Sequence, residues 1–206
     1  MVELARRRYE AVGIEISRPM IDHAFDKARK ASVKLELLEG NMSDFILDEP
    51  VDAAFCAIDT FRYLLTENSA LSHLSCVARS LRPEGIYIID FTLVGLLGSY
   101  PKPAEEWTIE REDASVTVSH KIVGLPDLEK RRTIERTILT VTEAGLTKKI
   151  ETEDPMRTYT KNEFEALLHS GGFFELVAWH GPDFSIEREE NPRPETERVI
   201  AVLKKK

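Results

Sequence analysis

The hydrophobic and polar positions of the first ninety residues follow two alternating periodicities. Apolar runs cover residues 11–16, 33–38, 51–58 and 86–91, and the stretches between them repeat apolar residues every three or four positions. A run that is apolar almost throughout, such as 51–58, is typical of a strand covered on both faces. The order strand, helix, strand, turn, strand, helix, strand predicts an α/β fold with a mainly parallel sheet.

A different pattern begins after residue 93. Apolar and polar residues alternate with period two in 115–122 and 133–141, and the Glu-Ala-Gly sequence at 143–145 predicts a hairpin turn before a further strand at 147–150. This alternation is typical of half-exposed antiparallel strands. We therefore expect an antiparallel β insertion that lies over the parallel sheet.

The α/β pattern returns near the C-terminus. Residues 160–163, Thr-Lys-Asn-Glu, form a capping-box sequence, and Gly171-Gly172 ends the helix that follows. Two apolar stretches at 173–179 and 198–203 then predict the last strands. We divide the chain into an N-terminal sheet part at 1–99, an antiparallel insertion at 100–156, and a C-terminal part at 157–206 that completes the sheet.

Composition and charge exclude several classes of protein. The chain has 28 Lys and Arg residues against 36 Asp and Glu residues, a net charge of −8, which disfavours a nucleic-acid partner. No apolar run reaches the roughly 20 residues that span a bilayer, so no membrane partner is expected. The two cysteines, Cys56 and Cys76, are expected to be buried free thiols of a cytoplasmic protein. No HExxH motif or Cys/His cluster is present, so we expect no metal.

Polar residues stand where several predicted strands end. In an open α/β sheet the ligand crevice lies beyond these ends, which brings Glu15, Asn41, Asp59 and Asp90 into consideration. A carboxylate such as Glu15 can accept hydrogen bonds from both hydroxyls of a ribose. From position alone, a solvated acid at a strand end is an equally good interpretation.

Four segments occur in a characteristic order: 13–21 (GIEISRPMI), 38–45 (LEGNMSDF), 52–59 (DAAFCAID) and 81–85 (LRPEG). They resemble the motifs around the second to fifth strands of class I S-adenosylmethionine-dependent methyltransferases, and 156–173 resembles the tail of the small-molecule branch. The resemblance covers about 1–92 and 155–206. It implies a Rossmann-like, mostly parallel sheet with an antiparallel last strand, and S-adenosyl-L-methionine as the cofactor.

The resemblance also implies a role for individual residues in holding the cofactor. Glu15 would bind the ribose hydroxyls and Ile16 would pack on the adenine. Asn41, where the family usually has Asp, would accept from the adenine amino group, and the Met42 N–H would meet a ring nitrogen. The segment Ala57, Ile58 and Asp59 would lie near the methionine portion and the reactive methyl.

The insertion would form a lid over the methyl acceptor. Tyr63, Trp107, Arg157 and Tyr159 are candidates for lining the acceptor pocket, although packing or surface ion pairs are also good interpretations for each. Methyl transfer depends mainly on alignment of donor and acceptor, so no catalytic residue can be singled out. His120 lies in the period-two insertion, where we expect a solvent-facing side chain.

One departure from the family pattern lies at the start of the chain. The first strand and its Gly-rich loop should precede the helix to which residues 2–9 would belong. Without that strand, the second and fourth strands are each expected to expose an edge. We expect a truncated sequence rather than a natural short form, with impaired cofactor binding and marginal stability.

The sequence as a whole predicts an S-adenosylmethionine-dependent methyltransferase acting on a small molecule, or a truncated form of one. Two alternatives stay open. An NAD(P)-dependent Rossmann oxidoreductase also places an acid after its second strand. A binding or assembly module that has lost the cofactor site would pair its exposed edges with another chain. A homo-oligomer is compatible with an enzyme and with such a module.

Overall fold

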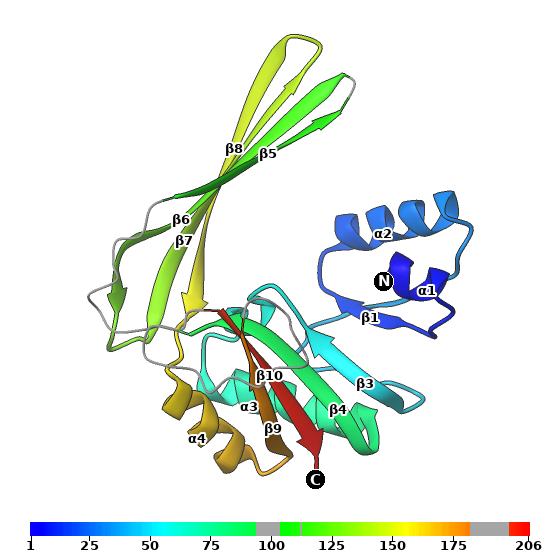
Figure 1. Ribbon diagram of the computed structural model, residues 1–206, viewed down its shortest axis with the longest axis vertical. Coiled ribbons are helices and arrows are strands. Elements are labelled where there is room, and N and C mark those ends of the chain that lie inside the picture. The colour runs from blue at the N-terminus through cyan, green and yellow to red at the C-terminus, as the bar shows by residue number, and fades with distance from the viewer. Residues whose placement is uncertain (94–103, 112, 182–197) are drawn as a thin grey trace.

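The computed structural model describes residues 1–93, 104–111, 113–181 and 198–206. Its elements are drawn in Figure 1. In chain order they are α1 (Val2–Arg6), β1 (Val12–Glu15), α2 (Arg18–Lys30), β2 (Glu36–Glu39), β3 (Val51–Cys56), the 3-10 helix η1 (Thr60–Tyr63), α3 (Glu67–Ser80), β4 (Leu81–Thr92), β5 (Glu105–Arg111), β6 (Ala114–Asp127), β7 (Arg132–Glu143), β8 (Leu146–Arg157), α4 (Lys161–Gly171), β9 (Phe174–His180) and β10 (Arg198–Lys205).

The described strands form three separate sheets. β1 and β2 are a parallel pair, β3, β4, β10 and β9 lie side by side in that order, and β5 to β8 form an antiparallel meander. In the second sheet β3 and β4 are parallel, whereas β10 is antiparallel to both of its neighbours. The predicted α/β architecture with an antiparallel last strand is confirmed.

Two strands expose an edge, as the sequence predicted. Among the described residues β1 pairs only with β2, and β3 pairs only with β4. The backbone groups on the other edge of each strand therefore have no ladder partner there. Figure 1 shows β1, β2, α1 and α2 as a small unit beside β3.

The core lies on the face of the second sheet that α3 and α4 cover (Figure 1). Its centre is a cluster of aromatic rings, in which the centroids of Phe91 and Phe164 are 4.8 Å apart and Phe61 packs against both. The opposite face is different. Phe55 and Ile88 pair in register there and are both exposed, Phe55 by 60%. The described helices thus cover one face of this sheet only.

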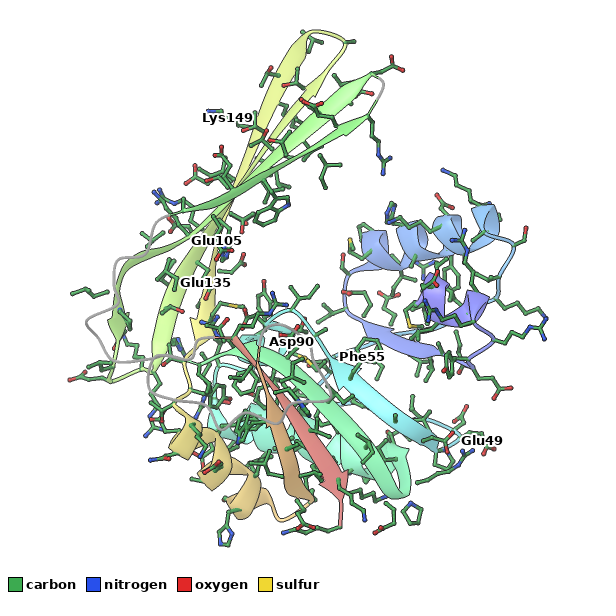
Figure 2. All side chains as sticks on the ribbon, viewed as in Figure 1. Glu49, Phe55, Asp90, Glu105, Glu135 and Lys149 are labelled. Atoms are coloured by element: carbon green, nitrogen blue, oxygen red, sulfur yellow. The ribbon has the colours of Figure 1, made fainter. Side chains whose placement is uncertain are left out.

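The insertion differs from the prediction in two ways. It has four strands rather than three. The strand that the sequence did not predict is β5, which carries only two large apolar residues, Trp107 and Ile109. It also does not lie over the parallel sheet along its length. Figure 1 shows its sheet projecting away from the body, and Figure 2 places Lys149 at the far end and Glu135 near the body. The predicted boundary at residues 99 and 100 lies outside the described residues.

Helix ends follow the local sequence closely. The predicted capping box of α4 is present, since Thr160 and Glu163 bond each other's backbone N–H, and Gly172 ends the helix at φ +70°. α3 begins at Glu67, because Thr66 caps it in a reciprocal pair with Ser69.

Candidate cofactor site

Glu15 ends β1, and its carboxylate is oriented by the backbone just beyond it. The Ser17 N–H donates to Glu15 Oε1 at 2.8 Å, and Ser17 is the N-cap of α2, although its own side chain makes no capping bond. The other oxygen, Oε2, has no hydrogen-bond partner among the described residues. A half-buried carboxylate held in this way is a ready acceptor for a diol.

The segment after β2 is tied to the same place. The Gly40 N–H donates to the Glu15 carbonyl at 3.0 Å, and the next residue, Asn41, begins a tight turn. Asn41 Oδ1 accepts from the Ser43 N–H and from its hydroxyl, both at 2.9 Å. That oxygen is therefore already occupied, so accepting from an adenine would require the turn to rearrange. The Met42 N–H, in contrast, has no acceptor among the described residues and is available to a ligand.

The loop after β3 has an unusual backbone. Ile58 and Asp59 have φ angles of +54° and +58°, a region that a β-branched residue such as Ile rarely adopts. Asp90, near the end of β4, holds the loop there: its Oδ2 accepts from the Ile58 N–H at 3.1 Å, and its carbonyl accepts from the Asp59 N–H at 3.1 Å. Such over-determined strain is found at functional sites more often than elsewhere.

Asp59 and Asp90 are both fully engaged. The Asp59 carboxylate accepts from the N–H and hydroxyl of Thr92 at 2.6 and 2.9 Å, and Asp90 is clamped by two bonds from Arg198 at 2.9 and 2.8 Å. Desolvation raises the pKa of Asp90, but the bonds from Arg198 and from the Ile58 N–H, with the Arg198 charge, outweigh it and bring that pKa below its usual value. Both acids therefore shape the loop.

A buried ionic cluster lies behind this loop. The Arg62 side chain is 2% exposed and contacts Glu135 at 2.7 Å, Asp59 at 3.3 Å and Thr133 Oγ1 at 3.0 Å, and its Nε donates to the Arg157 carbonyl at 2.9 Å. Arg62 comes from η1 and Glu135 from β7. The cluster therefore fastens the insertion to the loop that follows β3.

The four predicted acceptor residues lie in different environments. Tyr63 and Trp107 are half-exposed, whereas Arg157 and Tyr159 are buried. Tyr159 packs among the core aromatic rings, and the Arg157 guanidinium lies 5.0 Å from the centre of its ring. Burial raises the pKa of Tyr159 to about 12, and the nearby charge of Arg157 opposes this rise only in part. Only Tyr63 and Trp107 are placed where a ligand could reach them directly.

The structure therefore gathers the predicted cofactor residues into two groups. Glu15, Ile16, Asn41 and Met42 lie together at the ends of β1 and β2, and residues 57–59 lie at the end of β3 beside Asp90. Ile16 and Ile58 are both largely exposed, by 68% and 76%. Two apolar side chains in the open at strand ends are suited to contact a flat or sulfur-containing ligand.

Sequence reasoning missed the Arg62–Glu135 pair and its third member, His120. His120 was expected to face solvent, but its side chain is only 34% exposed and its Nε2 lies 3.2 Å from Glu135 Oε2. The period-two pattern carries no signal for the pair, because both faces of β7 are equally apolar. Leu139 and Val141 share a face with Glu135, and Ile134 and Ile138 lie on the other.

Residues 1–85 match the protein family described as a methyltransferase domain. Among solved structures, the chain is similar to an S-adenosylmethionine-dependent methyltransferase from Clostridium acetobutylicum ATCC 824, at TM-score 0.76 and 16% identity over 98% of this chain and 77% of that one. It is also similar to the CcbJ methyltransferase from Streptomyces caelestis, at TM-score 0.75 and 18% identity over 100% and 83%. The likeness to these structures shows that the chain shares their fold, and residues 1–85 are the part that matches the methyltransferase-domain family.

Relatives by sequence agree with the methyltransferase domain. "Putative methyltransferase YqeM" of Bacillus subtilis (strain 168) is 31% identical over 90 residues, which are 43% of this chain and 36% of that protein. "Putative methyltransferase GWCH70_2453" of Geobacillus sp. (strain WCH70) is 26% identical over 99% of this chain and 79% of that protein. The match to YqeM thus spans about a third of its length.

Two expectations about other ligands can be compared with the structure. In the part of the chain that is described, no group of three or more His, Cys, Asp and Glu side chains is arranged to hold a metal ion. No described helix is long and apolar enough to cross a membrane. Both cysteines, Cys56 and Cys76, are free and buried, as the sequence predicted.

Proposed function

We propose that the protein binds S-adenosyl-L-methionine and transfers its methyl group to a small molecule. The observation that carries the proposal is Glu15, a carboxylate fixed by the Ser17 N–H with its second oxygen unengaged among the described residues. It stands at a strand end, beside the available Met42 N–H. One acceptor and one donor so placed match the ribose hydroxyls and a ring nitrogen of adenosine.

Each part of the cofactor has a candidate contact in this proposal. Glu15 would hold the ribose, Ile16 would cover the adenine, and the Met42 N–H would bond its ring. Asn41 would contribute after its turn with Ser43 opens. Residues 57–59, held by Asp90, would lie along the methionine portion. The bound sulfonium supplies an electrophilic methyl, and the chain supplies alignment and exclusion of water.

Titration of S-adenosylhomocysteine by calorimetry tests the proposal, with Glu15→Gln as the variant. Losing a charged acceptor for two hydroxyls should weaken binding about 10- to 100-fold. Glu36→Gln is a matched control, because Glu36 lies at the opposite end of the β1–β2 pair and is exposed; its affinity should equal that of the wild type. Equal affinities for all three proteins, or no binding at millimolar ligand, would refute the proposal.

Calorimetry also distinguishes S-adenosylmethionine from the alternative cofactor, a nicotinamide dinucleotide. NADH titrated under identical conditions should give no heat, and binding of NADH in preference to S-adenosylhomocysteine would favour the oxidoreductase. We also propose that the protein works in the cytoplasm, which two free buried thiols support. Its partner in this view is the small-molecule acceptor, and light scattering would establish whether it also self-associates.

A further inference from the structure

Four ionisable side chains close to the body share one face of the insertion. In the register of the sheet, Glu105 of β5 stands directly opposite His120 of β6, and Glu135 of β7 stands directly opposite Asp154 of β8. His120 and Glu135 touch diagonally across β6 and β7. These four residues are called the inner-face group below. Figure 2 shows Glu105 and Glu135 on the part of the insertion nearest the body.

A chain of contacts leads from this group to the candidate cofactor site. His120 Nε2 lies 3.2 Å from Glu135 Oε2, Glu135 Oε1 lies 2.7 Å from Arg62, and Arg62 lies 3.3 Å from Asp59. Glu135 and Arg62 are both buried, whereas His120 is one-third exposed. The His120 imidazole is therefore the most exposed side chain in this series of contacts, and a ligand can reach it.

The arrangement around His120 is that of an oriented base. A buried carboxylate oxygen lies 3.2 Å from His120 Nε2. A carboxylate so placed favours the proton on that nitrogen, which leaves the other nitrogen as an acceptor. His120 Nδ1 has no hydrogen-bond partner among the described residues. A histidine with a purely packing role does not need a buried carboxylate that is itself clamped by a buried arginine, because burying both charges is costly.

We propose that His120 contacts the methyl acceptor and accepts a proton from it, and that this acceptor is an amine. The inference rests on the proposed function. In the first step the ammonium group of the acceptor gives a proton to His120, leaving a nitrogen lone pair. That lone pair forms the N–C bond as the C–S bond breaks, and the bonding electrons pass to sulfur. The products are an N-methylated ammonium ion and S-adenosylhomocysteine, and His120 then returns its proton to water.

The charge of the inner-face group favours an amine over an alcohol or an acid. Glu105 and Asp154 have no ion-pair partner among the described residues, so both carboxylates are available to a cation. Trp107 lies two residues from Glu105 on the same face and is 47% exposed, which offers an aromatic surface to an ammonium group. Tyr63 lies close to the inner-face group. Burial raises its pKa, and the charges of Asp154 and Glu135 raise it further.

The charged groups around His120 come from several elements, and they include Arg198, whose pKa the charge of Glu105 raises. Glu105 faces it from β5, Glu135 from β7 and Asp154 from β8, while Arg62 and Asp59 stand behind Glu135. The three carboxylates favour a positive charge on a bound amine, and Arg62 opposes it. A protonated His120 cannot accept a second proton, so transfer should slow as the pH falls.

Binding can be tested without cofactor by proton NMR of the five histidines, with the His120 resonance assigned from its loss in His120→Gln. Benzylamine is the probe, and benzyl alcohol is its matched neutral compound. Benzylamine at millimolar concentration should shift the His120 resonance, and Glu105→Gln should weaken that effect several-fold. A His120 resonance that responds equally to the alcohol, or to neither compound, overturns the proposal, whatever S-adenosylhomocysteine binding shows.

Transfer is tested with methyl-labelled S-adenosylmethionine and benzylamine, tyramine or ethanolamine, against benzyl alcohol, tyrosol and ethylene glycol. Label should pass to amines only. His120→Gln should lower the rate about 100- to 1,000-fold near pH 7, with affinity for S-adenosylhomocysteine within twofold of wild type. The deficit should narrow as the pH rises, because the amine then loses its proton in solution.

The matched control is Lys121→Gln, the next residue on β6, whose side chain lies on the opposite face. Its rate and pH profile should equal those of the wild type. Label in an alcohol, or a His120→Gln rate within threefold of the wild type across the pH range, overturns the proposal. Failure of S-adenosylhomocysteine to bind would instead remove the proposed function, while the NMR experiment still reports on the amine site.

Discussion

Replacement of Arg62 by Met should be among the most damaging single changes in the chain. Arg62 is 2% exposed and meets Glu135, which is 7% exposed, at 2.7 Å. Without the guanidinium, the Glu135 carboxylate stays buried with the Thr133 hydroxyl at 3.4 Å and the partly exposed His120 beside it, and no positive guanidinium to balance it. Thr133 and the Arg157 carbonyl also lose their donor. Breaking a buried pair by removing one partner costs about 3–5 kcal/mol, a large fraction of the stability of an ordinary domain.

Urea unfolding at pH 7 measures this cost, as a double-mutant cycle with Glu135→Gln. The double variant should lose less than the sum of the single losses, by about 1–3 kcal/mol, because neither charge is then stranded. Arg62→Lys keeps a charge and should be milder, which leaves a measurable variant if Arg62→Met does not fold. The control is Arg136→Met, a partly exposed arginine paired with Glu153 and Glu151 on the other face of the sheet, expected to cost less than about 1 kcal/mol. A loss that small for Arg62→Met would refute the reasoning.

Three further expectations follow from buried positions. Burial lowers the pKa of His73 below its ordinary 6.5, so the folded state binds fewer protons than the unfolded state just under that pH. The stability of the wild type should therefore fall as the pH drops below about 6.5. Urea midpoints of His73→Gln measured at pH 7 and 5 should lack this fall. Burial raises the pKa of Cys56 to about 11, so a maleimide should label its thiol slowly in the native protein and quickly in urea, and fast native labelling would contradict this. A Cβ at Gly85 would lie 2.9 and 3.2 Å from two backbone carbonyl oxygens, so Gly85→Ala should cost about 1–3 kcal/mol, whereas Gly40→Ala, with its nearest contact at 3.8 Å, should unfold near the wild-type midpoint.

The parallel part of the fold was predictable because strong local signals agreed with tertiary packing. The apolar run at 51–58, the capping box at Thr160 and the Gly172 end each specify an element without reference to the rest of the chain. β5, the strand of the insertion that the sequence did not predict, lacks such a local signal. Residues 105–111 are all exposed, so their strand is defined by pairing with β6 rather than by burial.

The candidate site was predictable only in part, for a similar reason. Glu15, Asn41 and Asp59 are placed by strand ends, which the sequence marks. Contacts between residues far apart in sequence are not marked. The partners of Asp59 are Thr92 and Arg62, and those of Arg62 lie in the insertion, so the buried cluster appears only once the sheets are assembled.

The clamp on the loop after β3 has a consequence for the order in which the protein matures. Arg198 is 108 residues beyond Asp90, the residue through which it steadies Ile58. During synthesis the loop therefore lacks its brace until the last strand has emerged and paired with β4. A substitution in β10 would therefore loosen the loop at Ile58 without changing any of the residues proposed above to contact the cofactor.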